Sequence, residues 1–211
     1  MGKYRLHVLI ISFVFLLTPI IHSAEEPFIT LRSSYKDLSI SQVQLMSNIS
    51  IRERGDWGFC GHSTINNRYE KLSIRGDSVV VNHATGLMWH QSGSLRVLNM
   101  EKAERWVHEL NRQEYAGQKR WRMPTVEEAV TLLESSKYGG GEGLHINSVF
   151  DLRQSRIWTC DRKAKTERGW LGVSITKSGR YWWRVDFTMG SVSWLIKLKD
   201  FNYIRPVCTM R

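Results

Sequence analysis

Cysteine is scarce in this chain, where Cys60, Cys160 and Cys208 are the only three among 211 residues. A structural zinc site typically uses four cysteine or histidine ligands at close, recognisable spacing. Cys60 with His62 supplies only two such ligands, and the nearest further histidines flank a predicted hairpin turn. The sequence therefore predicts no metal centre, and it shows no motif for a bound cofactor.

Complete catalytic signatures are also missing. The stretch "HELNR" lacks the second histidine of a zincin, and "GHSTI" lacks the final glycine of a nucleophile elbow. "SSYK" and "SITK" match the serine–lysine spacing of some acyl enzymes but occur without the accompanying motifs. The glycine-rich "KYGGGEG" follows a predicted helix, whereas a phosphate loop follows a strand. We therefore expect a protein that is not an enzyme.

The chain has no apolar run long enough for a typical membrane span. Its longest run, from His7 to Ile21, covers about fifteen residues and contains Pro19, whereas a spanning helix needs about 20. Lys3 and Arg5 precede it, which is the layout of a secretory signal. We predict a signal peptide over residues 1–24 and export to the periplasm or the cell exterior. Membrane contact is expected only if this segment stays uncleaved as an anchor.

Acidic residues are scarce in the last third of the chain. Residues 151–211 hold thirteen Lys or Arg against five Asp or Glu, whereas residues 25–150 hold fifteen of each kind. This asymmetry predicts an anionic partner, such as an acidic or sulphated glycan or an anionic envelope surface. The alternative is a solvated basic face that only keeps the domain soluble. We expect no nucleic acid partner.

An exported chain can keep a disulfide, but three cysteines leave at least one thiol over. Cys160 and Cys208 end the β-like runs "RIWTC" and "YIRPVC". We expect these two to pair, because neighbouring strands can meet disulfide geometry. The role of Cys60 stays open.

The middle of the chain predicts a hairpin followed by two helices. "DSVVVNHATGLMWHQ" has two apolar runs around turn residues, which indicates a hairpin. The first helix is predicted between Asn99, a suitable N-cap, and Gly117, a suitable stop. Helical spacing gives its apolar face, which comprises Ala103, Trp106, Val107 and Leu110.

The second helix begins in "RMPTVEEAVTLL". Thr125 and Glu128 have the spacing of a capping box, and Pro124 keeps the preceding strand separate from the helix. Arg122 has no local helix role, so we expect it to reach a carboxylate or backbone carbonyls elsewhere. Paired catalytic acids are the alternative for Glu127 and Glu128, but adjacent helix positions point in different directions. We interpret this stretch as a folding joint.

The C-terminal part is predicted to be an antiparallel β meander with turns at "TKSGR" and "TMGS". Strands after a hairpin and two helices indicate an α+β domain. Upstream, "LSISQVQLM" predicts a short capped helix and "NISIRERGDWG" a strand leading into a turn. We interpret residues 25–70 as an extension that packs on the domain or links it to something else.

An ordered set of motifs resembles the Lcl C-terminal domain family, a bacterial domain family of unknown function. The set runs from "ATGLMWHQ" through "AERWVHELN", "YAGQKRWRMPTVEEAVTLLE", "INSVF", "IWT" and "WWRVDFTMGSVSW" to "YIRPV", over about residues 77–208. The resemblance implies one C-type-lectin-like domain, placed here at residues 71–211, related in fold to formylglycine-generating enzymes. It also implies an exported or surface setting, since the namesake is a collagen-like adhesin that binds sulphated glycosaminoglycans.

Three departures limit what the resemblance implies about function. The chain has no collagen-like Gly-X-Y tract, and the EPN, QPD and WND triplets of calcium-dependent lectins are absent. The catalytic cysteine arrangement of formylglycine-generating enzymes cannot be placed on its three cysteines. The family resemblance therefore supports the predicted fold more strongly than it supports any activity.

The tryptophans complete the functional prediction. Trp89, Trp106, Trp121 and Trp158 fall in the family motifs and are expected in the core. Trp182 and Trp183 are adjacent on one strand, so one of them is expected nearer the surface. We predict a non-catalytic module for an anionic glycan or envelope polyanion; the alternative is a structural or protein–protein interaction module. The predicted ligand contacts are Arg180, Trp182, Arg184, Trp194, Lys197 and Lys199.

Overall fold

The structure, a computed structural model, describes residues 28–138, 143–168, 174–196 and 201–210. It is an α+β fold with two sheets, which confirms the predicted class. The helical elements in the described part are α1 (Ile40–Gln44), α2 (Met100–Arg112), the 3₁₀ turn η1 (Tyr115–Gly117) and α3 (Val126–Val130). The predicted signal peptide, residues 1–24, lies outside the described residues.

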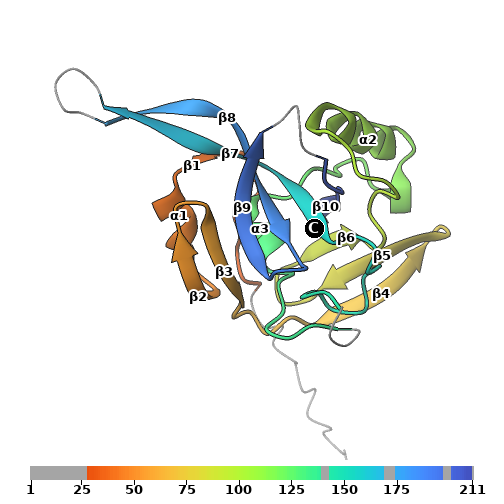
Figure 1. Ribbon diagram of the computed structural model, residues 1–211. Coiled ribbons are helices and arrows are strands. Elements are labelled where there is room, and N and C mark those ends of the chain that lie inside the picture. The colour runs from red at the N-terminus through yellow and green to blue at the C-terminus, as the bar shows by residue number, and fades with distance from the viewer. Residues whose placement is uncertain (1–27, 139–142, 169–173, 197–200, 211) are drawn as a thin grey trace, which may run out of the picture.

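The larger sheet has six strands in the order β1-β7-β8-β9-β3-β2. β7, β8 and β9 form the predicted antiparallel meander, and β1 pairs with β7 in parallel. Figure 1 shows β7 and β8 extending together beyond the body of the molecule. The strands are β1 (Asp37–Leu38), β2 (Ile49–Gly55), β3 (Gly58–Ser63), β7 (Arg156–Arg168), β8 (Ser174–Asp186) and β9 (Ser191–Ile196).

The smaller sheet has four antiparallel strands in the order β10-β6-β5-β4. They are β4 (Tyr69–Ile74), β5 (Asp77–Asn82), β6 (Leu87–His90) and β10 (Val207–Thr209). β5 and β6 form the predicted hairpin. The run "YIRPVC", expected in the meander, instead ends as β10 beside β6, with Val207 opposite Trp89.

Residues 28–70 form part of the same folded unit. They supply β1, α1, β2 and β3, and β3 pairs directly with β9 of the meander. Val43 and Phe59 are fully buried in the core shared with the later strands. The expected domain boundary at residue 71 falls inside β4. The residues before this boundary therefore pack on the domain, which is the first of the two expected alternatives, and their strands complete the larger sheet.

One of the two predicted turns of the meander is confirmed and the other is wrong. The chain turns at "TMGS" between β8 and β9, where Gly190 has a positive φ of 60°. "TKSGR", the other predicted turn, lies inside β8. Glycine in a strand is permitted, so its presence did not decide between turn and strand.

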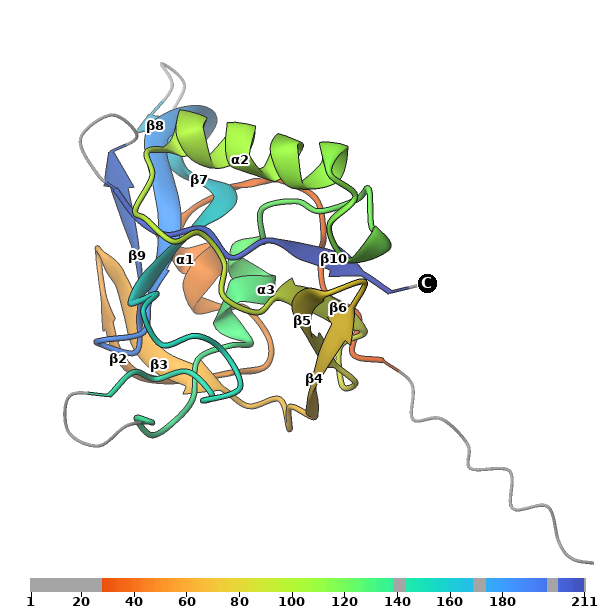
Figure 2. The same cartoon turned by 90° about the vertical axis from the view of Figure 1, so that its right-hand side faces the viewer.

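Both predicted helices form with the predicted N-caps, but α2 ends at Arg112, before the expected stop at Gly117. Asn99 accepts a hydrogen bond from the Lys102 N–H at the start of α2, and Thr125 with Glu128 closes a capping box at α3. The buried face of α2 includes Ala103, Val107 and Leu110. Figure 2 shows α2 along the outside of the molecule, above β10.

The stretch around α3 is a folding joint, as predicted. Asp161, which is fully buried, accepts two hydrogen bonds from the Arg32 guanidinium at 2.9 and 2.7 Å. The same carboxylate accepts from the backbone N–H groups of Lys36 at 2.8 Å and Val126 at 2.7 Å. One carboxylate therefore joins the N-terminal segment, β7 and the start of α3.

Candidate functional site

The two adjacent tryptophans of β8 are both buried. Trp182 is 5% exposed and Trp183 is fully buried, so the prediction that one of them lies near the surface was wrong. Both faces of this part of the sheet are covered. Trp183 packs in the core shared with α3, whereas Trp182 packs in a second core beneath α2.

The strand register separates the predicted ligand residues. Trp194 lies opposite Trp183, whereas Trp182 lies opposite Leu195. Because side chains alternate along a strand, Trp194 is on the other face of the sheet from Trp182 and Arg184. Arg184 contacts Ser193 and Asp186 on its own face. Trp182 and Trp194 therefore do not form one platform.

The remaining predicted contacts are not placed by the structure. Lys197 and Lys199 lie outside the described residues. For Arg180 only the backbone position, within β8, is described. Their role in ligand binding stays a prediction.

Trp194 is the centre of a smaller aromatic cluster. It is half-buried, and its ring meets Tyr181 edge to face with centroids 4.8 Å apart. The Lys163 ammonium lies 4.8 Å from the centroid of the Trp194 ring. The indole N–H is 3.4 Å from the Asp56 carbonyl oxygen. We call Lys163, Tyr181 and Trp194 the β7–β9 patch.

The expected Cys160–Cys208 disulfide is not formed, and all three cysteines are free. Cys160 is on β7 and Cys208 on β10, so the two belong to different sheets and are not on neighbouring strands. Burial raises the pKa of the Cys160 thiol to about 12 and that of Cys208 to about 11. At neutral pH both are therefore protonated thiols with weak nucleophilicity.

Sequence reasoning missed a pocket of about 490 Å³ beside α2. Its volume is in the usual range for ligand pockets, about 300–1,000 Å³. Trp106, expected in the core, is half-buried and forms part of its wall. The lining residues are His90, Ser92, Gly93, Ser94, Leu95, Arg96, Leu98, Trp106 and Tyr115. We call this the His90 pocket.

Buried polar groups hold the loop that walls the His90 pocket. Arg205, fully buried, donates to the backbone carbonyls of His90, Gln91 and Asp151. Farther along the loop, the Ser94 N–H donates to the Ile204 carbonyl at 2.9 Å. These bonds join the loop to the segment that leads into β10, so the pocket wall is preformed.

Gly93 is required in this loop for two reasons. Its φ is +61°, in the left-handed region that favours glycine. A Cβ atom there would lie 2.2 Å from the Gln154 amide nitrogen and 2.5 Å from the Ile204 carbonyl oxygen. The "QSGS" glycine therefore permits the close approach that shapes the pocket.

His90 is the larger of two buried polar side chains in the pocket lining, the other being Ser94. Its ring stacks on Tyr115 with centroids 4.3 Å apart and planes 11° from parallel. Its Nδ1 accepts a hydrogen bond from the Gly93 N–H at 2.9 Å. Burial first, and then the nearby Arg205 charge, lower the pKa of His90 to about 4, against an opposing effect of Asp77. The ring is therefore neutral at pH 7, with its proton on Nε2.

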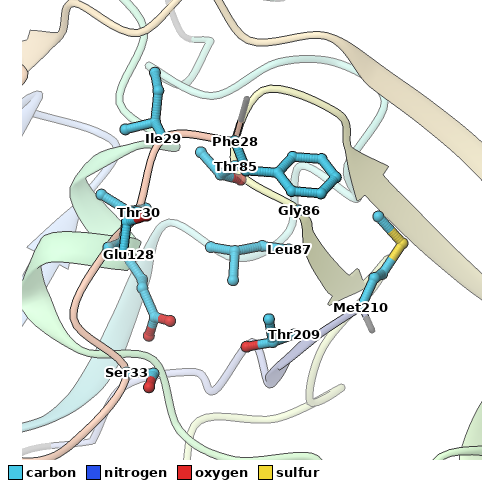
Figure 3. A pocket seen from close by; sticks show the side chains of 11 residues that line it. Phe28, Ile29, Thr30, Ser33, Thr85, Gly86, Leu87, Glu128, Thr209 and Met210 are labelled. Atoms are coloured by element: carbon cyan, nitrogen blue, oxygen red, sulfur yellow. The ribbon is translucent and has the colours of Figure 1, made fainter. Parts of the chain in front are cut away.

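A second cavity of about 280 Å³ lies between the 28–33 segment and the strands β6 and β10. Figure 3 shows Leu87 in its middle, Phe28 and Met210 toward one side, and the Glu128 carboxylate at another. Glu128 already accepts hydrogen bonds from Arg122 and Thr125. Its carboxylate is therefore used in holding the fold together.

Two absences concern only the described part of the chain. There, no three His, Cys, Asp or Glu side chains gather in a way that could hold a metal ion. Within the same residues, no helix has the length and apolar character of a membrane span.

Comparison with known proteins decides the family. The sequence model of the Lcl C-terminal domain matches residues 78–208. The chain belongs to the Lcl C-terminal domain family. The resemblance noted in the sequence is thereby confirmed. Neither the curated proteins nor the solved structures contain a match to this chain.

The Lcl C-terminal domain contains the whole His90 pocket and the whole β7–β9 patch, since both lie within residues 78–208. Residues before it supply Arg32 and β1 to β3, which complete the larger sheet. A local signal for the pocket was available in the sequence. "SGSLRV" places two apolar residues in a glycine-containing loop, and in the structure Leu95 is 72% exposed.

Proposed function

We propose that this protein is an exported, non-catalytic module that binds an anionic glycan or another envelope polyanion. The proposal includes the signal peptide over residues 1–24 and the C-type-lectin-like character of the fold. The layout of the first 24 residues supports the former, and the family resemblance supports the latter.

The observation that carries the proposal is the β7–β9 patch. A half-buried tryptophan, a tyrosine and a lysine ammonium meet there, with Lys163 4.8 Å from the Trp194 ring centroid. A sugar ring presents C–H groups that pack on such aromatic surfaces, and a cation beside it attracts a sulphate or carboxylate. In the described part of the chain, Lys163 forms no ion pair. Its charge is therefore available to a ligand.

Charge distribution supports an anionic partner. Residues 151–211 carry a net charge of +8, and they include β7, β8 and β9. A field of one sign concentrates polyanions near the surface and accelerates their association. We expect the patch to orient the ligand and the surrounding charge to attract it.

A sharp test is retention on heparin along a salt gradient. We expect Lys163→Gln to elute at lower salt than the wild type. Lys71→Gln is the matched control, because Lys71 is an exposed lysine on β4 of the other sheet. Equal elution of both variants would mean that only net charge matters and that the patch is not the binding face.

A glycan array separates this function from its alternative, a structural or protein–protein interaction module of the envelope. Selective binding to sulphated or uronic-acid polymers supports the glycan function. Absence of binding to any acidic glycan supports the alternative, in which the basic strands contribute solubility alone.

A further inference from the structure

The geometry points to the His90 pocket as a binding site for a small aromatic monocarboxylate, a ligand with one flat apolar ring and one carboxylate. This site is separate from the β7–β9 patch, and the inference stands even if that patch binds nothing.

The apolar lining of the pocket suits the aromatic ring of the proposed ligand. Trp106, Tyr115, Leu95 and Leu98 surround the pocket with apolar and aromatic surface. The Trp106 ring is tilted against the His90 ring with centroids 5.4 Å apart, and the Tyr115 ring stacks on the same His90 ring. The Trp106 and Tyr115 rings are therefore held in fixed orientations. Aromatic pairs prefer such offset or tilted arrangements, and a flat ring entering the pocket would meet them.

His90 accounts for one oxygen of the carboxylate. Its Nδ1 is occupied by the Gly93 N–H, which leaves Nε2–H as the free donor of the neutral ring. In the described part of the chain no hydrogen bond reaches Nε2, although His90 is only 6% exposed. Nε2 is not one of the fully buried unpaired atoms of the described residues, so it opens toward the pocket, where a ligand oxygen would replace water as its acceptor.

Arg96 accounts for the charge. Arg96 lies on the loop that walls the pocket, and its exposed side chain is part of the lining. No carboxylate of the described residues pairs with this side chain. The backbone of Arg96 is held in place, because the Ser94 hydroxyl donates a hydrogen bond to the Arg96 carbonyl at 2.9 Å. An arginine at the rim can add a charge-assisted hydrogen bond to a carboxylate that His90 also contacts.

The scarcity of other polar groups argues against a sugar as the occupant. A pyranose carries a hydroxyl on most ring carbons, and each needs a partner when it is buried. Ser94 already donates to Arg96 and accepts from the Ile204 N–H at 3.1 Å. The Ser92, His90 and Arg96 side chains and the Trp106 indole N–H are then left to bind oxygen, which suits one carboxylate better than a ring of hydroxyls.

Titration calorimetry of the mature protein with 3-phenylpropanoate tests the inference. The comparison ligands are 3-phenylpropanamide, which keeps the ring but has no charge, and glucuronate, which keeps the charge on a sugar ring. We expect the acid to bind more tightly than either. Equal affinity for acid and amide, tighter binding of glucuronate, or no heat from the acid at millimolar concentration would overturn the inference.

Two variants locate the site. Arg96→Gln is expected to weaken binding of the acid by up to about fivefold and leave binding of the amide unchanged, since an exposed charge pair contributes only about 0.2–1 kcal/mol. Arg52→Gln is the control, because Arg52 is an exposed arginine on β2. His90→Phe keeps the ring stack but removes the donor, so acid and amide should both weaken. An Arg96→Gln variant with unchanged affinity for the acid would place the ligand elsewhere.

Discussion

Arg122 binds Glu128 through both terminal nitrogens of its guanidinium, at 2.7 and 2.5 Å from the two carboxylate oxygens. Glu128 is fully buried, and its carboxylate also accepts the Thr125 N–H at 2.9 Å. Glu128, which closes the capping box of α3, is thus the carboxylate partner that the sequence predicted for Arg122. Arg122 and the helix start of "WRMPTVEE" therefore form one joint, whereas Trp121 donates hydrogen bonds to Asn111 and Tyr115.

Loss of Arg122 should destabilise the protein strongly. Arg122→Gln leaves the buried Glu128 carboxylate without its cation, and breaking a buried pair in this way typically costs about 3–5 kcal/mol. Urea denaturation measures the change. Arg120→Gln is the matched control, since Arg120 is exposed and has no hydrogen-bond or ion-pair partner in the described part of the chain. It should change stability by less than about 0.5 kcal/mol. Equal effects of the two variants would contradict the joint.

His90 should make stability depend on pH below neutrality. Its pKa is about 4 in the folded protein and about 6.5 when unfolded. Between these values the unfolded chain binds a proton that the folded protein excludes, so stability is full above pH 6.5 and falls toward pH 4. The loss is at most about 3 kcal/mol.

Urea midpoints at pH 7 and pH 4.5 test the His90 prediction. The His90→Phe variant should lose part of the decrease that the wild type shows. His108→Gln, an exposed histidine of α2, should behave as the wild type does. A wild-type decrease that His90→Phe reproduces in full would assign it to other groups.

A thiol reagent should detect all three cysteines as free thiols. A thiol reagent under denaturing conditions without reductant should report three per chain, because all three are free. In the native protein, Cys160 and Cys208 should react slowly, since burial holds their pKa values at about 12 and 11. A count of one thiol would instead establish the disulfide expected from the sequence.

Charge reversal at Lys197 and Lys199 tests a part of the ligand prediction that the structure does not place. The double change to Glu should abolish heparin retention and leave the melting temperature nearly unchanged, since lysines that are free to contact a polyanion contribute little to folding stability. Retention at the wild-type salt concentration would remove these two lysines from the binding face.

Local signals predicted much of this fold. Both capping boxes, at Ser39 with Gln42 and at Thr125 with Glu128, formed as their spacing indicated, because a cap involves only four consecutive residues. The hairpin of β5 and β6 is equally local. Pairing between distant segments was not predictable, because alternation along a strand does not reveal its neighbour. β10 therefore joined β6 instead of the meander.

The arrangement of the candidate site residues could not be derived from the sequence for the same reason. Adjacent positions put Trp182 and Trp183 on opposite faces, but only the register with β9 shows which face Trp194 shares. The His90 pocket combines a strand end, a loop, α2 and η1. Helical spacing assigned Trp106 to the buried face of α2, and only the arrangement of the other segments shows that it is partly open.

The central claim is that the β7–β9 patch binds an anionic glycan. The most direct measurement is the affinity of the mature protein for a heparin hexasaccharide, by titration calorimetry at low and at physiological salt. We expect measurable binding that weakens steeply with salt, because condensed counterions are released and exposed charges are screened. Lys163→Gln should bind more weakly with a shallower salt dependence, and Lys71→Gln should match the wild type. Absence of binding at low salt, or an affinity that neither salt nor Lys163→Gln changes, would contradict the account.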